Sequence, residues 1–357
     1  MNALRVPEFI QQHAPAKPLA DGVRDALLYA IDHSRNLYFP SGVYDLGDNY
    51  FPFPHSIDGD VRDYRGIHIF GDGDSTVIST TSGPKTGRDV FQLNKTANLV
   101  VRDLAITAHL GSTRSTSGSN GVSITNGGAN IRFENVVCFD LPYIDKGSYG
   151  DGGKAFTIQT GQYIPGVSVK NEHIRFVNCR ARNCLYGFGV DAQFEHMYPG
   201  HSHDIFVDLS AENCYRGVSL SGTEPSIKMS TASTGITINA NTHNCQQDFT
   251  AMRMWGFRFS GRSSQSVPKK ALVKKIRSDK TRIALRIAGC RRSSVRFTCD
   301  VLPKDADDLF LFESAKCGQN GVHECQFNDV SINSAVDQAA PYLDATNHLI
   351  FNGQDAG

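Results

Sequence analysis

A repeated unit of about 30 residues limits what this chain can fold into more than any other feature of its sequence. Seven segments align on it, each with an alternating strand, a polar residue and a second short strand. They are ANLVVRDLAI (97–106), ANIRFENVVC (129–138), EHIRFVNCRA (172–181), HDIFVDLSAE (203–212), TGITINANTH (234–243), SSVRFTCDVL (293–302) and HECQFNDVSI (323–332). Apolar residues at every second position indicate half-buried strands. The sequence therefore predicts a stack of similar coils.

Asn-Cys pairs begin at Asn183, Asn213 and Asn244, with spacings of 30 and 31 residues. In stacked coils, equivalent residues lie about 4.8 Å apart. Asparagine tolerates the left-handed backbone of a sharp corner, and its amide can bond to the asparagine of the next coil. We expect the cysteines to be small, free interior residues. The 9 cysteines contain no C-x-x-C pair, which favours neither a disulfide framework nor a zinc site.

A β-sandwich is the alternative architecture for so many short strands. It would need tight two-residue hairpins every 8–12 residues or so, but Asn-Gly and Asp-Gly turns between alternating runs are scarce. A parallel β-helix fits the repeat better.

The N-terminal residues LADGVRDALLYAIDHSRNLYFPSGVYDLG (19–47) and IHIFGDGDSTVI (67–78) resemble the start of the pectate-lyase-like right-handed parallel β-helix superfamily. The motif covers residues 20–78, and the coils extend the resemblance to about residue 334. The resemblance implies an all-β solenoid with a short N-terminal capping helix. Its members include polysaccharide lyases, glycoside hydrolases, epimerases and phage tailspike depolymerases, so the fold does not settle the chemistry.

We expect the capping helix at 23–33, where Val23, Ala26, Leu27, Ala30 and Ile31 share one face. It would cover strand edges that could otherwise aggregate. The predicted organisation is a cap segment and helix at 1–34, the β-helix at 35–334, and a C-terminal tail or cap at 335–357.

Composition excludes some classes of partner. Lys+Arg and Asp+Glu both total 36, so charge gives no indication of a nucleic-acid partner. No stretch approaches the roughly 18 apolar residues of a membrane span, and no secretory signal is visible at the N-terminus. Together with unpaired cysteines, this favours the tailspike group of the superfamily. That resemblance implies a homotrimer and an extracellular or virion-associated location.

The first strand of each coil gives the expected working face. If Phe156, Phe188 and the apolar residues two positions later point inward, their neighbours point outward. The outward stripe would contain Gln159, Asp191 and Ser221 in consecutive coils, beside Thr157, Gly189 and Ser219, with Arg253 as an extension. A glycine within a strand also permits close approach by a ligand.

Three long loops leave this face, at 138–154, 191–204 and 221–231, and they mix aromatic residues with carboxylates. Loops on a rigid scaffold are where function concentrates. Glycoside hydrolysis needs two carboxyl groups, about 5–5.5 Å apart for retention and about 6.5–9.5 Å for inversion. We predict Asp191 and Glu195 as the catalytic pair, with Glu224, Asp145 and Asp151 as reserves.

The predicted substrate-binding residues are Tyr149, Gln159, His196, Ser221 and Arg253. The expected partner is a bacterial surface or extracellular polysaccharide, cleaved within the polymer. No cofactor is expected. The histidines of HMYPGHSH (196–203) have spacings of five and two, which do not match the helical zinc site, so no metal is expected either.

Two other functions stay open. A polysaccharide lyase would need a base and a cation that neutralises a uronate carboxylate. Residues 269–296 contain 11 Lys/Arg and a single acid, Asp279, and could attract such a polymer. The third hypothesis is a β-helix shaft that binds glycans without cleaving them.

Overall fold

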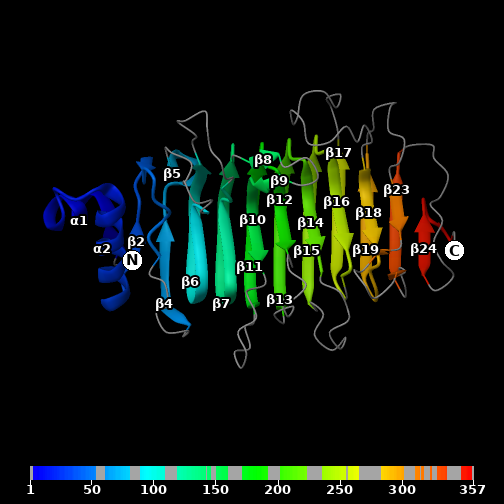
Figure 1. Cartoon of the computed structure of the whole chain (residues 1–357), viewed down its shortest axis with the longest axis horizontal. Coiled ribbons are helices and arrows are strands. Elements are labelled where there is room, and N and C mark those ends of the chain that lie inside the picture. Colours follow the sequence, from blue (N-terminus) through cyan, green and yellow to red (C-terminus); the bar gives the residue numbers. More distant parts are fainter. Residues whose placement is uncertain are drawn as a thin grey trace.

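A computed structural model gives the fold of the chain. It describes residues 3–53, 61–80, 89–108, 119–141, 143–145, 150–159, 171–191, 202–222, 235–254, 256–264, 283–300, 310–313, 315–316, 322–323, 328–335 and 347–355. These residues form a right-handed parallel β-helix, as the repeat predicts. In Figure 1 its coils follow one another from the N-terminal helices to the C-terminus.

One sheet of 21 strands winds through the whole stack. Each coil contributes a first, a second and a third strand segment, and we name the outer surfaces of the three stacks the first-, second- and third-strand faces. The first-strand stack runs through the starts of β6 (Phe91–Ala108) and β7 (Val122–Phe139), then β10 (Lys154–Gln159), β12 (Tyr186–Asp191), β14 (Arg216–Ser221), β16 (Gln247–Met252), β18 (Ile283–Ala288) and β20 (Phe310–Glu313).

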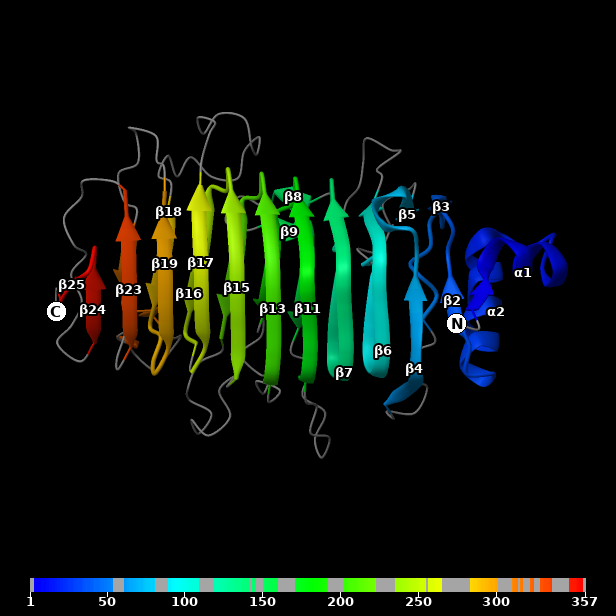
Figure 2. The same cartoon turned by 180° about the vertical axis from the view of Figure 1, so that it is seen from behind.

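The second and third segments are joined within longer strands, which lie side by side in Figure 2. These are β4 (Arg62–Phe70), β6, β7, β11 (Asn171–Arg182), β13 (Ser202–Glu212), β15 (Ile236–His243), β17 (Arg258–Ser264), β19 (Ser294–Cys299) and β23 (Asp329–Ser334). β3 (Gly42–Asp45) and β5 (Thr76–Thr80) begin the third-strand stack.

The described strands also include three small antiparallel pairs. They are β8 (Tyr143–Asp145) with β9 (Gly150–Gly152), β21 (Ala315–Lys316) with β22 (Val322–His323), and β24 (His348–Phe351) with β25 (Gln354–Asp355). β24 also pairs in parallel with β23, so the stack continues beyond residue 334.

Asparagine ladders hold the corners, as the repeat predicts. Asn178, Asn183 and Asn213 all have positive φ, between 50° and 54°. The Asn213 amide donates to Asn183 Oδ1 (3.3 Å), and the Asn183 amide donates to Asp140 Oδ1 (2.6 Å). A second ladder runs from Asn178 to Asn135 (2.7 Å) at the corner between second and third segments. Short polar side chains thus let these coils turn at equivalent places.

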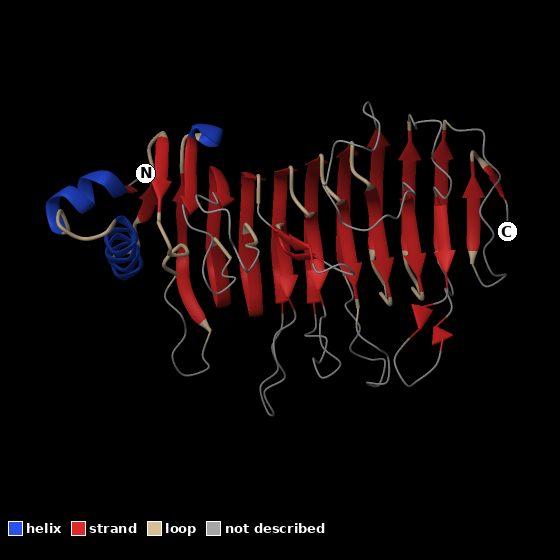
Figure 3. Ribbon diagram, turned by 45° about the horizontal axis from the view of Figure 1, so that its top comes forward, coloured by secondary structure: helices blue, strands red, loops and turns tan. Residues whose placement is uncertain are grey.

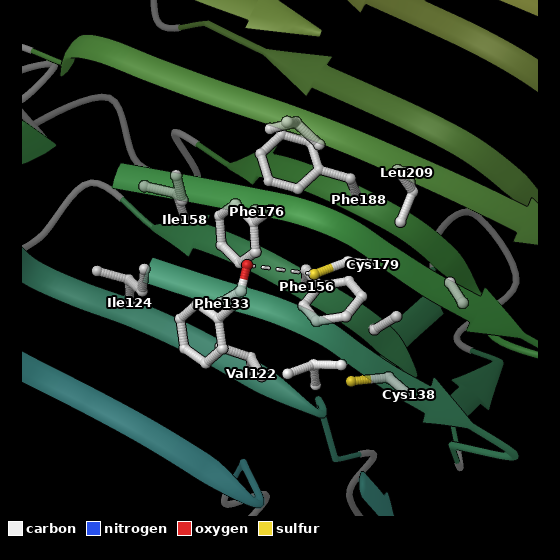
Figure 4. Packing of buried hydrophobic residues seen from close by; sticks show 14 of the residues in the cluster. Val122, Ile124, Phe133, Cys138, Phe156, Ile158, Phe176, Cys179, Phe188 and Leu209 are labelled. Carbon is white, nitrogen blue, oxygen red and sulfur yellow. Dashed lines mark hydrogen bonds between the residues drawn. The ribbon is translucent and has the colours of Figure 1, made fainter. Parts of the chain in front are cut away.

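The core lies inside the coils, where equivalent residues stack on one another (Figure 4). Phe133 and Phe176 are parallel, with centroids 5.2 Å apart, and Phe156 and Phe188 meet Phe176 edge-on. Such aromatic pairs add about 0.5–1.5 kcal/mol each beyond burial. The seven cysteines in the described part of the chain are buried and free, which confirms their expected role.

Helices cover the N-terminal end of the stack (Figure 3). The predicted capping helix is α2 (Leu19–Asp32), and its predicted apolar face is buried. It begins four residues earlier than expected. The helix α1 (Val6–His13) and the strand β1 (Ala3–Arg5), which pairs with β2 (Asn36–Tyr38), were not expected. Gly22 of the Asp-Gly motif packs against Ile10 of α1, where a Cβ would lie only 2.9 Å from Ile10 Cγ1.

Candidate functional site

Gln159, Asp191 and Ser221 occupy one row of the first-strand stack. Gln159 of β10 pairs with Asp191 of β12, which pairs with Ser221 of β14. The apolar residues that precede them along each strand, including Ile158 and Val190, are buried in the core. Three consecutive coils therefore place an amide, a carboxylate-bearing residue and a hydroxyl in one row, about one strand spacing apart.

A band of small residues runs beside this row. Thr157, Gly189 and Ser219 pair in register, but they are buried, contrary to the expectation of an exposed outward stripe: Thr157 is 0% exposed and Ser219 is 5% exposed. A Cβ added at Gly189 would meet only ordinary contacts, 3.6 Å from Tyr186 Cδ2 and 3.7 Å from Thr157 Oγ1. Packing around this buried position therefore does not by itself require glycine.

Arg253 does not extend the row, contrary to expectation. Met252 is the residue that pairs with Ser221, because the strand ends there and the chain turns. Arg253 occupies the corner, with φ of 55°, and its backbone N–H donates to Ala288 O (2.8 Å). Gly222 lies against the Arg253 carbonyl, where a Cβ would collide with the oxygen. Arg253 is thus next to the row, at the carboxyl end of β16.

The other predicted catalytic residues are only partly placed. Asp145 and Asp151 belong to the β8–β9 hairpin, where Asp145 pairs with Gly150 and Asp151 with Ile144. Four predicted residues lie outside the described part of the chain: Tyr149, Glu195, His196 and Glu224.

A second row of polar and charged side chains lies beside the first and was not predicted from the sequence. Lys154, Tyr186, Arg216 and Gln247 pair in register at the amino ends of β10, β12, β14 and β16. The Lys154 ammonium lies 5.5 Å from the Tyr186 ring centroid, and the Arg216 guanidinium lies 5.2 Å from it. Cation–π contacts of this kind contribute about 0.5–2 kcal/mol. One tyrosine ring is therefore flanked by two cations.

Hydrogen bonds fix the orientation of this row. Arg216 Nη1 donates to Tyr186 Oη (3.3 Å) and to Ser219 Oγ (3.2 Å), while Nε donates to Gln247 Oε1 (2.7 Å). Lys154 and Tyr186 each come one residue before an alternating run, AFTIQ (155–159) or GFGVD (187–191). The alternating pattern alone therefore does not indicate them.

Lys154 is buried, and a buried carboxylate lies near it. Burial raises the pKa of Asp89 above its ordinary value, while the positive charge of Lys154 acts in the opposite direction. Asp89 Oδ1 accepts from the backbone of Asn120 (3.1 Å), and Asn120 Oδ1 accepts from the backbone of Lys154 (3.1 Å). These two side chain–backbone hydrogen bonds between successive coils position the start of β10.

A hollow of about 180 Å³ opens on the third-strand face. Arg180 Nη2 binds both carboxylate oxygens of Asp74 (2.6 and 2.7 Å), and the Arg182 guanidinium lies 5.4 Å from the Phe139 ring centroid. Glu212 also lines it. Asp74 and Arg180 are 106 residues apart in sequence, and no local pattern connects them.

Within the described ranges, no group of three or more His, Cys, Asp or Glu is arranged to hold a metal ion. None of the described helices is long and apolar enough to span a membrane.

The chain is thus a right-handed parallel β-helix protein with a polar first-strand face. No family model matches it, and no curated protein matches it. Solved structures of similar fold include the A-module of mannuronan C-5 epimerase AlgE4 from Azotobacter vinelandii, at 13% identity over 92% of this chain and 87% of that one, with a TM-score of 0.49.

Two further structures have a similar fold. The Dettilon tailspike protein has 12% identity over 87% of this chain and 68% of that one, with a TM-score of 0.43. An exopolygalacturonase from Thermotoga maritima has 9% identity over 99% of this chain and 92% of that one, with a TM-score of 0.40. Similarity this distant concerns the fold alone, so the chemistry has to be argued from the site.

Proposed function

We propose that this protein is a carbohydrate-active enzyme that cleaves a bacterial surface or extracellular polysaccharide within the polymer. The observation that carries the proposal is the register of Gln159, Asp191 and Ser221 on three consecutive strands. A carboxylate-bearing residue between two neutral hydrogen-bonding residues suits a sugar chain lying across the coils. The parallel strands supply the rigid support that such a site needs.

The proposed reaction is hydrolysis by two carboxyl groups. Asp191 is one of them, and Glu195 is our first choice for the other, with Glu224, Asp145 and Asp151 as reserves. One carboxyl group protonates the leaving oxygen, while the other activates water or attacks the sugar itself. The five proposed substrate-binding residues hold the neighbouring sugar units: Tyr149, Gln159, His196, Ser221 and Arg253.

The test is a screen of capsular and extracellular polysaccharides for loss of viscosity and release of reducing ends. On the polymer that is cleaved, Asp191→Asn should lower kcat by about 10²- to 10⁴-fold, the usual contribution of an acid–base group. Asp32→Asn, an exposed carboxylate at the end of α2, is the matched control and should leave the rate unchanged. Full activity of Asp191→Asn would refute the assignment of Asp191.

A lyase is the second candidate, and the Lys154–Tyr186–Arg216 row favours it. The two cations would neutralise a uronate carboxylate, and the Tyr186 oxygen between them would accept the proton alpha to that carboxylate. The glycosidic oxygen on the next carbon would then leave and take up a proton, and a carbon–carbon double bond would form. The two reactions differ in product, because elimination leaves an unsaturated sugar that absorbs ultraviolet light. Under this alternative, Tyr186→Phe abolishes cleavage, and Asp191→Asn does not.

We also propose a homotrimer with an extracellular or virion-associated location, which rests on the resemblance of the N-terminal motif and coils to tailspike proteins. Sedimentation equilibrium should give three times the chain mass of 39.1 kDa. A monomer mass at assay concentrations would refute the trimer. If no polymer is cleaved but one is bound, the non-catalytic shaft replaces the enzyme.

A further inference from the structure

A hollow of about 410 Å³ opens on the second-strand face, over β15, β17 and β19. This volume is within the range of ligand sites. Its polar lining comes from six side chains: Thr237, Asn239, Arg258, Ser260, Ser294 and Arg296. Every one of them can donate a hydrogen bond, and none is a carboxylate. The lining is therefore complementary to an acceptor-rich, negatively charged group.

The two arginines occupy diagonal positions on neighbouring strands. Arg258 of β17 pairs with Ser294 of β19, and Ser260 of β17 pairs with Arg296. Each arginine thus has a serine hydroxyl beside it on the next coil. Guanidinium groups bind carboxylates and tetrahedral oxyanions through paired hydrogen bonds, which are stronger than neutral ones.

Several other arginines on the outer faces have carboxylate partners. Arg132 pairs with Glu134, Arg175 with Asp204, and Arg262 with Asp300. Within the part of the chain that the structure describes, Arg258 and Arg296 form no such ion pair and no side-chain hydrogen bond. Their charge is therefore left for a ligand.

The nearest carboxylates along these rows are already engaged. Asp329 pairs in register with Ser294 and binds His348 Nδ1 (3.0 Å). Asp208 pairs in register with Asn239 and accepts from the backbone of Asn178 (3.2 Å). They flank the hollow without filling it, so its centre keeps a positive charge.

We propose that this hollow is a second glycan-binding site, which takes the oxyanion of an acidic polysaccharide: a uronate carboxylate or a sulfate ester. It lies on a different face from the Gln159–Asp191–Ser221 row and would hold the polymer while another part of it is cleaved. The inference rests on the proposed function in one respect, because that function supplies a polysaccharide as the ligand. It also explains Arg296, the last residue of the basic run at 269–296.

The test is binding to the full chain by calorimetry, at low and high salt. The probes are an oligogalacturonate, a sulfated dextran and a neutral dextran. The wild type should bind an anionic probe in a salt-sensitive way, and the neutral dextran should bind far more weakly at this site. The double variant Arg258→Gln/Arg296→Gln should bind the anionic probe about tenfold or more weakly, because two charge-assisted contacts are lost. Arg132→Gln, from the same face, is the matched control and should bind like the wild type.

Preference for one anionic probe identifies the oxyanion as carboxylate or sulfate, and either result supports the site. Undiminished binding in the double variant would overturn it. So would a change in oligomeric state of that variant in sedimentation, because the arginines would then contact another copy of the chain. The Asp191→Asn variant should keep its affinity for the anionic probe. Binding at this hollow can therefore be tested even if the protein cleaves no polysaccharide.

Discussion

Asn183 is the residue at which the physical basis of the coil corners can be measured. Its φ is 54°, its amide donates to Asp140 Oδ1 (2.6 Å), and its Oδ1 accepts from Asn213 (3.3 Å). Asn183→Ala loses two hydrogen bonds of about 1 kcal/mol each and adds a left-handed cost of about 1–2 kcal/mol. We expect the free energy of unfolding to fall by about 3 kcal/mol.

The Asn183→Gly variant distinguishes the cost of the lost hydrogen bonds from the cost of the left-handed backbone. Asn183→Gly loses the same hydrogen bonds but adopts the left-handed backbone freely, so it should recover about 1 kcal/mol relative to alanine. The assay is denaturant unfolding followed by circular dichroism. Asn241→Ala, an exposed residue of β15 with ordinary strand geometry, should stay within about 0.5 kcal/mol of wild type. Equal effects of alanine and glycine would refute the left-handed argument, and no effect of either would refute the ladder.

Two further predictions concern thiols and pH. Burial raises the pKa of Cys179 to about 12, and the other six cysteines of the described part of the chain are buried too. A Cys317→Ser/Cys325→Ser variant, which keeps only these seven thiols, should therefore not react with a thiol reagent when native but should show seven reactive thiols once denatured. Reaction in the native state would contradict the buried core. The hydrogen bond from Arg175 holds the pKa of Asp204 below its ordinary value. The ionised Asp204 carboxylate therefore stabilises the folded protein above about pH 4, and this stabilisation is lost as the pH falls through the pKa of Asp204 in the folded state. Asp204→Asn should therefore unfold more easily at neutral pH by less than about 1 kcal/mol, and a deficit that persists in acid would contradict this cause.

The sequence could predict which strand residues lie in the core and where the corners fall, because both depend on local rules. Alternation decides that Ile158 and Val190 lie in the core, and asparagine marks the corners. The same rules failed at Arg253, because the strand ends one residue before it and the corner removes it from the row. A one-residue difference in where a strand stops is not visible in an alternating pattern.

Contacts between coils were beyond the sequence for a different reason. Asp74 and Arg180 meet across 106 residues, and Arg258 and Arg296 line one hollow from separate coils. Which residues of different coils lie side by side depends on the register of the sheet and on the lengths of intervening loops. No local pattern in a single sequence indicates the register and the loop lengths together.

The central claim is that a polysaccharide is bound and cleaved across the carboxyl ends of β10, β12 and β14. The most direct measurement is a crystal structure of the Asp191→Asn variant with an oligosaccharide of the polymer that the wild type cleaves. We predict sugar units in contact with Gln159 and Ser221, with the scissile bond next to residue 191. An oligosaccharide bound only on another face, with the Gln159–Ser221 row left empty, would contradict the account.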